Sequence, residues 1–183
     1  MLIVPLLTMR LFSEEKRQKT DLVFYCSPTS LGAVVMGKFL AALGVLLVAL
    51  LGTGVYLALL AQRATLAWGS VAANYLGFLL LGSAYIAVGV WMSALTESQV
   101  TAAVLTLAAN MLLQLAEMSS ASLVTPFLPF LPALLQCIAL NQHFAQIASG
   151  VIYPTDLGYF LVFVTVFLSA TAWLLAHRKG KRR

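Results

Sequence analysis

Four long stretches, almost free of charged residues, set the strongest limit on what this chain can fold into. A helix needs about 20 mostly apolar residues to cross the hydrocarbon core of a bilayer. Apolar residues make up 61% of the chain and charged residues only 9%, whereas a soluble domain carries roughly 25% charged residues. The sequence therefore predicts an all-α integral membrane protein, a single helical bundle over 1–183, with four full spans at residues 32–60, 71–95, 98–117 and 157–177.

The segment 119–155 is harder to interpret. Residues 123–140 carry no charge and are long enough to span, but they contain prolines at positions 126, 129 and 132. Each proline removes a backbone donor, and lipid offers no substitute partner for the carbonyl groups that are left over. We therefore expect an external re-entrant or interfacial hairpin, with a proline-rich descent and a short helix near Ala133 to Ser149.

The basic residues indicate the orientation of the chain. They gather before the first full span and after the last one, and only Arg63 lies between the first two spans. Cytoplasmic segments of membrane proteins carry an excess of Lys and Arg. With four crossings both clusters lie in the cytoplasm, whereas a fifth crossing at 123–140 would break the rule. Both termini are expected to be cytoplasmic, and the net charge of +5 is explained by topology rather than by nucleic-acid binding.

The first nine residues, "MLIVPLLTM", are apolar but too short to cross a bilayer. As a helix they would extend only about 14 Å. They have no basic segment before them and no cleavage site, so they are not a signal peptide. We expect residues 1–9 to be the last turns of a spanning helix whose beginning is absent from this chain.

The stretch "GAVVMGKF" (32–39) resembles a phosphate-binding loop, which raises the question of whether the chain binds ATP itself. Such a loop needs Ser or Thr after its lysine to hold magnesium, and Phe39 has no hydroxyl. A membrane span follows at once, so Gly32 and Gly37 are expected to be packing residues and Lys38 to extend its amine to the interface.

The chain is not expected to be an enzyme or to bind a cofactor or metal. Its cysteines (Cys26 and Cys137) and its histidines (His143 and His177) are each expected to lie on opposite sides of the membrane.

Residues 13–26 predict a short cytoplasmic helix. Ser13 is a good N-cap, and acidic residues then lie at the positive end of the helix dipole. Pro28 marks the end. One interpretation is an amphipathic helix that lies on the membrane surface.

Two helix faces also stand out. In the third span, five polar residues recur at spacings of three, four and seven: Gln99, Thr106, Asn110, Gln114 and Glu117. Polar side chains avoid lipid, so this face is expected to meet other helices or to line a pathway. In the second span, Gly82, Gly89 and Ser93 form a small-residue stripe that would let another helix approach closely.

The chain resembles a known family over nearly its whole length. "PLLTMRLFSEEKRQKTD", then "SP" and "GKFLAAL", is similar to permease subunits of ATP-binding-cassette exporters of the second type, in the branch of the gliding-motility and copper-enzyme-maturation permeases. The resemblance continues in "NYLGFLLLGSAYIAVGVWMSALTESQVTAAVL" and in "HFAQIASGVIYPTDLGYFL". The family commonly has Gly before Thr20, where this chain has Lys19, and a leucine run where this chain has Phe24 and Tyr25.

The resemblance implies six spans in a complete chain, and a role for the 13–26 segment. That segment would be a coupling helix that contacts a separate ATPase subunit, which would carry the ATP and magnesium. The implied contact residues are Arg10, Glu14, Glu15, Lys16, Arg17, Lys19, Thr20, Asp21 and Phe24. A second permease subunit, identical or different, would complete the transporter in the inner or plasma membrane of a prokaryote. The alternative is a membrane scaffold or degenerate permease fragment that only binds partners.

Overall fold

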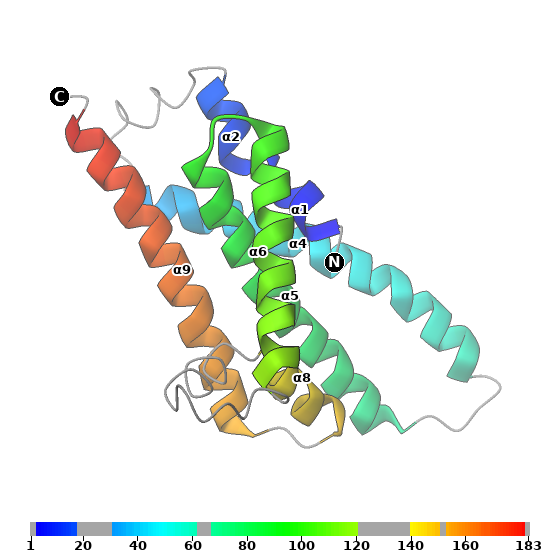
Figure 1. Cartoon of the computed structure of the whole chain (residues 1–183). Coiled ribbons are helices and arrows are strands. Elements are labelled where there is room, and N and C mark those ends of the chain that lie inside the picture. Colours follow the sequence, from blue (N-terminus) through cyan, green and yellow to red (C-terminus); the bar gives the residue numbers. More distant parts are fainter. Residues whose placement is uncertain (1–2, 18–30, 62–66, 121–139, 151–152, 182–183) are drawn as a thin grey trace, which may run out of the picture.

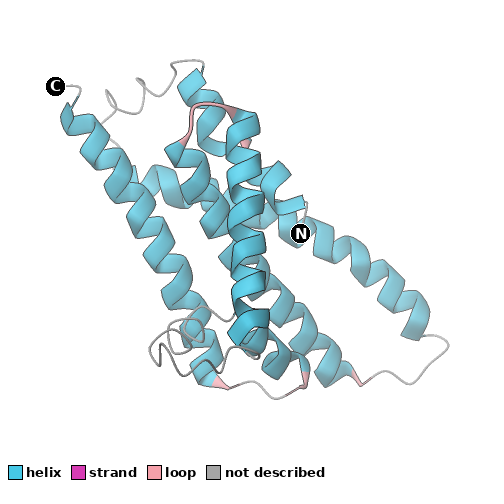
Figure 2. Ribbon diagram, viewed as in Figure 1, coloured by secondary structure: helices cyan, strands magenta, loops and turns pink. Residues whose placement is uncertain are grey.

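The computed structural model describes residues 3–17, 31–61, 67–120, 140–150 and 153–181, and all regular structure within these ranges is helical (Figure 2). The helices are α1 (Ile3–Thr8), α2 (Arg10–Arg17), α4 (Leu31–Ala61), α5 (Trp68–Leu95), α6 (Gln99–Ser120), α8 (Leu140–Ala148) and α9 (Pro154–Lys181). The all-helical fold class is as the sequence predicts.

Three of the described helices are long and apolar enough to cross a membrane: Leu31–Ala61, Trp68–Leu95 and Pro154–His177. Their bounds agree with three of the predicted spans to within a few residues. In α6 the apolar part is shorter, over Gln99–Leu115, although the whole helix has 22 residues. The fourth span therefore stays a prediction.

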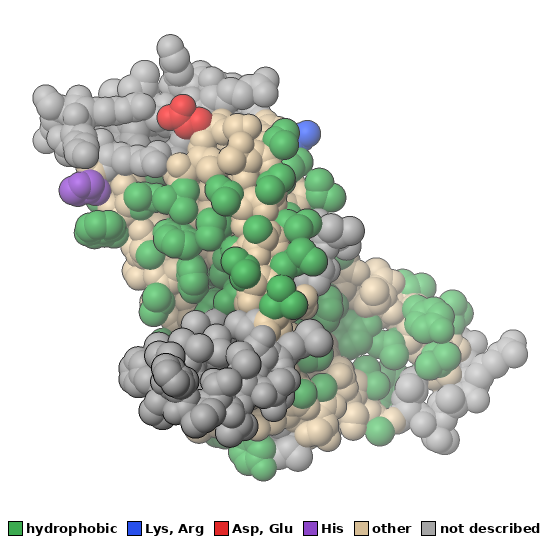
Figure 3. Space-filling view, viewed as in Figure 1, with side chains coloured by type: hydrophobic (Ala, Val, Ile, Leu, Met, Phe, Trp, Pro, Cys, Tyr) green, Lys and Arg blue, Asp and Glu red, His purple; other side chains and the backbone are tan. Residues whose placement is uncertain are grey.

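Helix α5 occupies the centre of the bundle and contacts every other described helix (Figure 1). From Leu81 to Val90 every residue is buried. Small residues make this possible, because Gly, Ala and Ser let neighbouring backbones approach on all sides. The outer surface of the bundle, in contrast, carries large apolar side chains. Figure 3 shows mostly hydrophobic side chains over the described part of this face, as expected for a protein whose surroundings are lipid.

The small-residue stripe on α5 receives side chains from two other helices, as its spacing predicts. A Cβ added at Gly82 would lie 2.6 Å from Cδ2 of Leu46 in α4. One added at Gly89 would lie 2.8 Å from Cβ of Thr8 in α1. At Gly89 the close atoms include the Cβ of a β-branched side chain, so this position limits how closely α1 packs on α5, whereas at Gly82 the close atom is the end of the flexible Leu46 side chain.

The prediction for Gly32 and Gly37 is wrong within the described residues. Both lie in α4, and no described atom comes within 4 Å of a Cβ built at either position. Gly37 lies on the side of α4 opposite to its buried residues Val35, Phe39 and Ala42, whereas Gly32 lies one turn before Val35, near the start of the helix.

The two ends of the bundle carry different elements. In Figure 1, α2 and the C-terminal end of α9 lie at one end, and α8 lies at the other. Helix α1 covers most of the predicted segment 1–9, and its Val4 and Thr8 are buried. The described part of the predicted helix near Ala133 to Ser149 is α8, whereas the proline-rich descent at 121–139 lies outside the described residues.

Local sequence explains where α8 ends and α9 begins. Gly150 follows α8 with φ of +91°, a conformation that glycine adopts without strain, and its N–H donates to the Ile147 carbonyl at 3.0 Å. Pro154 then occupies the first position of α9, where its missing N–H is not needed. Asp156 follows in the first turn, at the positive end of the helix dipole.

Candidate functional site

The junction between α1 and α2 lies at the start of the predicted coupling segment. Helix α1 ends at Thr8, and the N–H of Met9 donates to the Pro5 carbonyl at 2.9 Å. Helix α2 then begins at Arg10, three residues before the predicted start. The prediction that Ser13 is an N-cap is therefore wrong: Ser13 lies inside the helix, fully buried, and its hydroxyl donates back to the Met9 carbonyl.

The N-terminal turn of α2 is capped instead by a residue of α5. The first four N–H groups of a helix lack partners within it. Two of these in α2, from Phe12 and Ser13, donate to the Ser93 hydroxyl oxygen at 3.1 and 3.3 Å. The same hydroxyl donates to the Met9 carbonyl at 3.3 Å. Ser93 thus performs from another helix the capping that Ser, Thr, Asp or Asn normally performs from the preceding residue.

Lys38 of α4 makes a second attachment to α2. Its Nζ donates to the Leu11 carbonyl and lies 4.1 Å from the centre of the Phe12 ring. A cation in this position is attracted by the negative face of the ring. The lysine of the "GAVVMGKF" stretch therefore binds α2, whose N-terminal half is tied to both α4 and α5.

The structure describes only part of the predicted ATPase-contact set. Arg10 is exposed at the start of α2, and the backbone of Glu14, Glu15, Lys16 and Arg17 continues the helix. Residues Lys19, Thr20, Asp21 and Phe24 lie outside the described residues, as does the rest of the predicted 13–26 helix. Their contact role stays a prediction.

On α6, two members of the polar face are buried. Thr106 is fully buried, and its hydroxyl donates to the Ala102 carbonyl at 2.8 Å. Asn110 is 3% exposed, and neither side-chain amide atom has a hydrogen-bond partner among the described residues. Gln99 and Gln114 are half-buried, and Glu117 lies in the last turns of the helix. The role of this face in packing or in a pathway stays a prediction.

A polar pair that the sequence did not suggest joins α8 to α9. His143 Nδ1 lies 2.7 Å from Oδ1 of Asp156, whose side chain is 2% exposed. The imidazole stacks on Tyr159, with ring centres 4.2 Å apart. His143 therefore has a partner, although the sequence shows it isolated. The stretch "YPTD" could have indicated one half of this pair, because its proline predicts a helix start and places Asp156 in the first turn.

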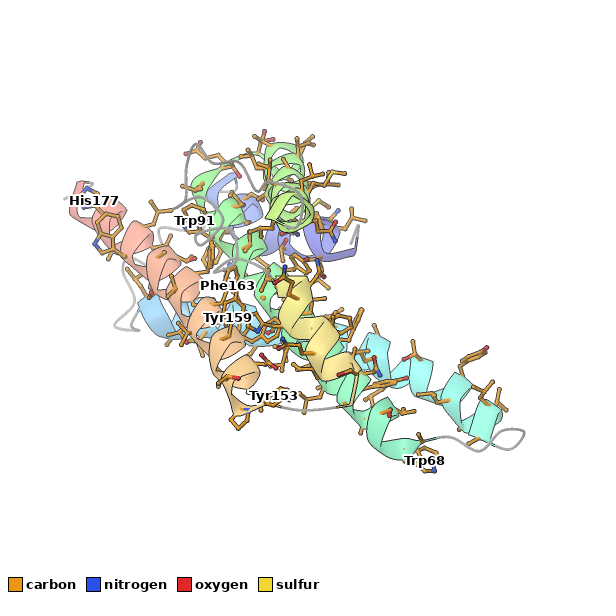
Figure 4. All side chains as sticks on the ribbon, turned by 60° about the horizontal axis from the view of Figure 1, so that its bottom comes forward. Trp68, Trp91, Tyr153, Tyr159, Phe163 and His177 are labelled. Carbon is orange, nitrogen blue, oxygen red and sulfur yellow. The ribbon has the colours of Figure 1, made fainter. Side chains whose placement is uncertain are left out.

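An aromatic row continues from this pair along α9. Tyr159, Phe163 and Phe167 follow at intervals of four residues, with successive ring centres 6.2 and 4.8 Å apart. Phe167 then meets Trp91 of α5 edge to face at 5.6 Å. Figure 4 labels Tyr159, Phe163 and Trp91 of this row, and His177 near the C-terminal end of α9. The row packs α9 against the central helix.

These arrangements hold helices together. Within the described part of the chain, no three His, Cys, Asp or Glu side chains come together as metal ligands would. The sequence drew attention to Ser93 only as a small residue and to Lys38 only as an interfacial charge. The partners of both lie in α2, which is remote in the chain, so spacing alone could not pair them.

A family model described as "ABC-2 family transporter protein" matches residues 2–179, nearly the whole chain. No curated protein and no solved structure matches it.

Proposed function

This chain belongs to the ABC-2 transporter family, and on that premise we propose that it is the permease of an ATP-driven exporter whose α2 segment receives the movement of a separate ATPase. Family membership makes it a membrane component that is not itself the ATPase. The exporter role, the coupling to ATP hydrolysis and the pairing with a second permease subunit are the proposed parts.

The attachment of α2 to two long membrane helices carries the proposal. A coupling element must pass displacement on to the spans, so it must be tied to them. Ser93 fixes the α2 backbone to α5 through Phe12 and Ser13, and Lys38 fixes it to α4. An amphipathic helix that only rests on lipid needs no such polar attachments, because its burial is apolar.

The proposed topology has four crossings and an external hairpin at 119–155. In Figure 1, α2 and the C-terminal end of α9 share one end of the bundle, and α6 runs from that end toward α8. This arrangement supports placing α2 and the C-terminal end of α9 on the cytoplasmic side and α8 outside, as the distribution of Lys and Arg favours, whereas α1 begins beside the middle of the bundle.

Charge reversal in the coupling segment tests the proposal. We expect Glu15→Lys and Arg17→Glu to weaken retention of a co-expressed ABC-type ATPase in pull-down from membranes. Truncating one partner of a desolvated charge pair costs about 2–5 kcal/mol, whereas a charge at the rim of a contact changes mainly the association rate, so retention should be lower in either case. Phe24→Ala should also weaken it, through lost packing.

The matched control is Gln146→Lys, which places a new charge on an exposed residue of α8 at the opposite end of the bundle. It should leave both ATPase retention and membrane insertion unchanged. If all three coupling-segment variants retain the ATPase as the unmodified chain does, the coupling role is wrong and the chain is better explained as a scaffold.

A further inference from the structure

A cavity of about 500 Å³ lies where α1, α4, α5 and α8 meet. Val4 and Leu7 line it from α1, and Phe144 lines it from α8. Its long walls come from α4, between Val45 and Thr53, and from α5, between Asn74 and Ile86. The volume is within the range of small-molecule sites, about 300–1,000 Å³.

The contacts between α4 and α5 show that this cavity is an elongated slot. The hydroxyl groups of Thr53 and Tyr75 form a hydrogen bond of 2.8 Å, and Leu46 contacts Gly82. The two helices therefore run antiparallel along the cavity. At 1.5 Å per residue, the lining stretches extend roughly 12 Å along α4 and 18 Å along α5. The hydrocarbon core of a bilayer is about 30 Å thick, so the slot is about one leaflet long.

The polar groups of the slot gather at one end. The hydroxyls of Thr53 and Tyr75 lie there beside the Asn74 amide, which donates to the carbonyls of Ser70 at 2.8 Å and Ala148 at 3.3 Å. The remaining lining residues are all apolar. A ligand that fits this pattern has one apolar chain and a polar group at one end.

The slot continues into the lipid-facing surface of α4. Val45, in its wall, is 55% exposed, and the neighbouring outward residues Val48 and Leu51 are 68% and 67% exposed. Water does not fill an apolar cavity in hydrocarbon, because it would lack hydrogen-bond partners there. The bilayer itself can supply the missing contacts.

We propose that this slot holds one acyl chain of a membrane phospholipid, with the ester and headgroup region at the Thr53–Tyr75 end. The lipid would lie in the leaflet nearest the α4–α5 connection. It would complete the packing between α4 and the centre of the bundle in the space beside the Thr53–Tyr75 and Leu46–Gly82 contacts. The proposal requires only that α4 and α5 lie in a bilayer, so it does not depend on coupling to an ATPase.

The test is photo-crosslinking of the full chain in liposomes of phosphatidylethanolamine and phosphatidylglycerol that contain a trace of phosphatidylcholine with a diazirine on one acyl chain. Surrounding lipid will label exposed positions such as Val48 in any case, so the diagnostic crosslinks are those at the slot-lining residues Leu46, Leu50 and Ile86. Ala49 lines the slot, so Ala49→Trp should fill it and abolish these crosslinks, and Ala49→Leu should reduce them. Val48→Trp, on the adjacent lipid-facing position, should leave them unchanged.

Three results would overturn the proposal. The first is unchanged slot labelling in Ala49→Trp, which would mean that the lipids are only those surrounding the protein. The second is a loss of slot labelling in Val48→Trp that equals the loss in Ala49→Trp. The third is labelling by a free diazirine fatty acid without labelling by the phospholipid. Because Ala49→Leu adds less volume, it tests the proposal even if Ala49→Trp does not fold.

Discussion

Helices α4 and α5 are both long, apolar and rich in glycine, yet their glycines serve different purposes. In α5, Gly82 and Gly89 lie against Leu46 and Thr8, closer than a Cβ would allow. In α4, five glycines have no described atom within 4 Å of a Cβ built on them: Gly32, Gly37, Gly44, Gly52 and Gly54. Glycine in a membrane helix therefore indicates close packing only where a second helix is present to use the space.

The largest effect is expected at Gly89. Gly89→Leu would force the side chain into Thr8 of α1, and overpacking of this kind costs about 3 kcal/mol when the neighbours cannot move. Equilibrium unfolding of the full chain in detergent would measure it. Gly52→Leu on α4 is the control and should cost much less. Equal destabilisation by the two substitutions would contradict the difference between the helices.

A smaller effect is expected at Ser93. Ser93→Ala removes the acceptor of the Phe12 and Ser13 N–H groups, and loss of a cap costs about 1 kcal/mol. Hydrogen exchange at these two amides should become faster. Ser169→Ala is the control, since that exposed hydroxyl only donates to the Val166 carbonyl of its own helix at 2.8 Å. Unchanged exchange at Phe12 and Ser13 would show that Ser93 does not cap α2.

The smallest effect is expected at Gly52. Gly52→Ala meets no described neighbour and improves helix propensity, so the free energy of unfolding should rise by about 0.5 kcal/mol. Gly82→Ala is the matched substitution on α5 and should lower it. A clear loss of stability in Gly52→Ala would reveal that another helix packs on this face of α4.

The positions of three of the spans could be predicted because they depend on composition and length. Runs of apolar residues must be helical in lipid, where every backbone group needs a partner within the segment. Which glycines pack against another helix could not be predicted, because Gly37 and Gly82 are the same residue and both lie in apolar stretches of sequence. Which one meets a neighbour depends on how the helices are arranged.

Of the predicted 13–26 helix the structure describes only 13–17, as part of α2, and the contacts of α2 were not predicted. The charged stretch after the first nine residues identified α2, but Ser13 was assigned the capping role that belongs to Ser93. A serine before two glutamates satisfies the local rule for an N-cap, and nothing in the sequence shows that another helix supplies the acceptor. The pair of His143 and Asp156 was missed because the two residues come from different helices, and the pairing depends on the turn at Gly150 and the start at Pro154.

The capping of α2 by Ser93 has a consequence for how the protein is made. Helix α2 has eight residues, and isolated helices shorter than about 12–15 residues are marginal in water. Ser93 follows Ser13 by 80 positions, so at about 5–20 residues per second the ribosome needs roughly 4–16 s to reach it. During biogenesis the α2 segment must therefore wait for α5 to enter the membrane before its own N-terminal turn is complete.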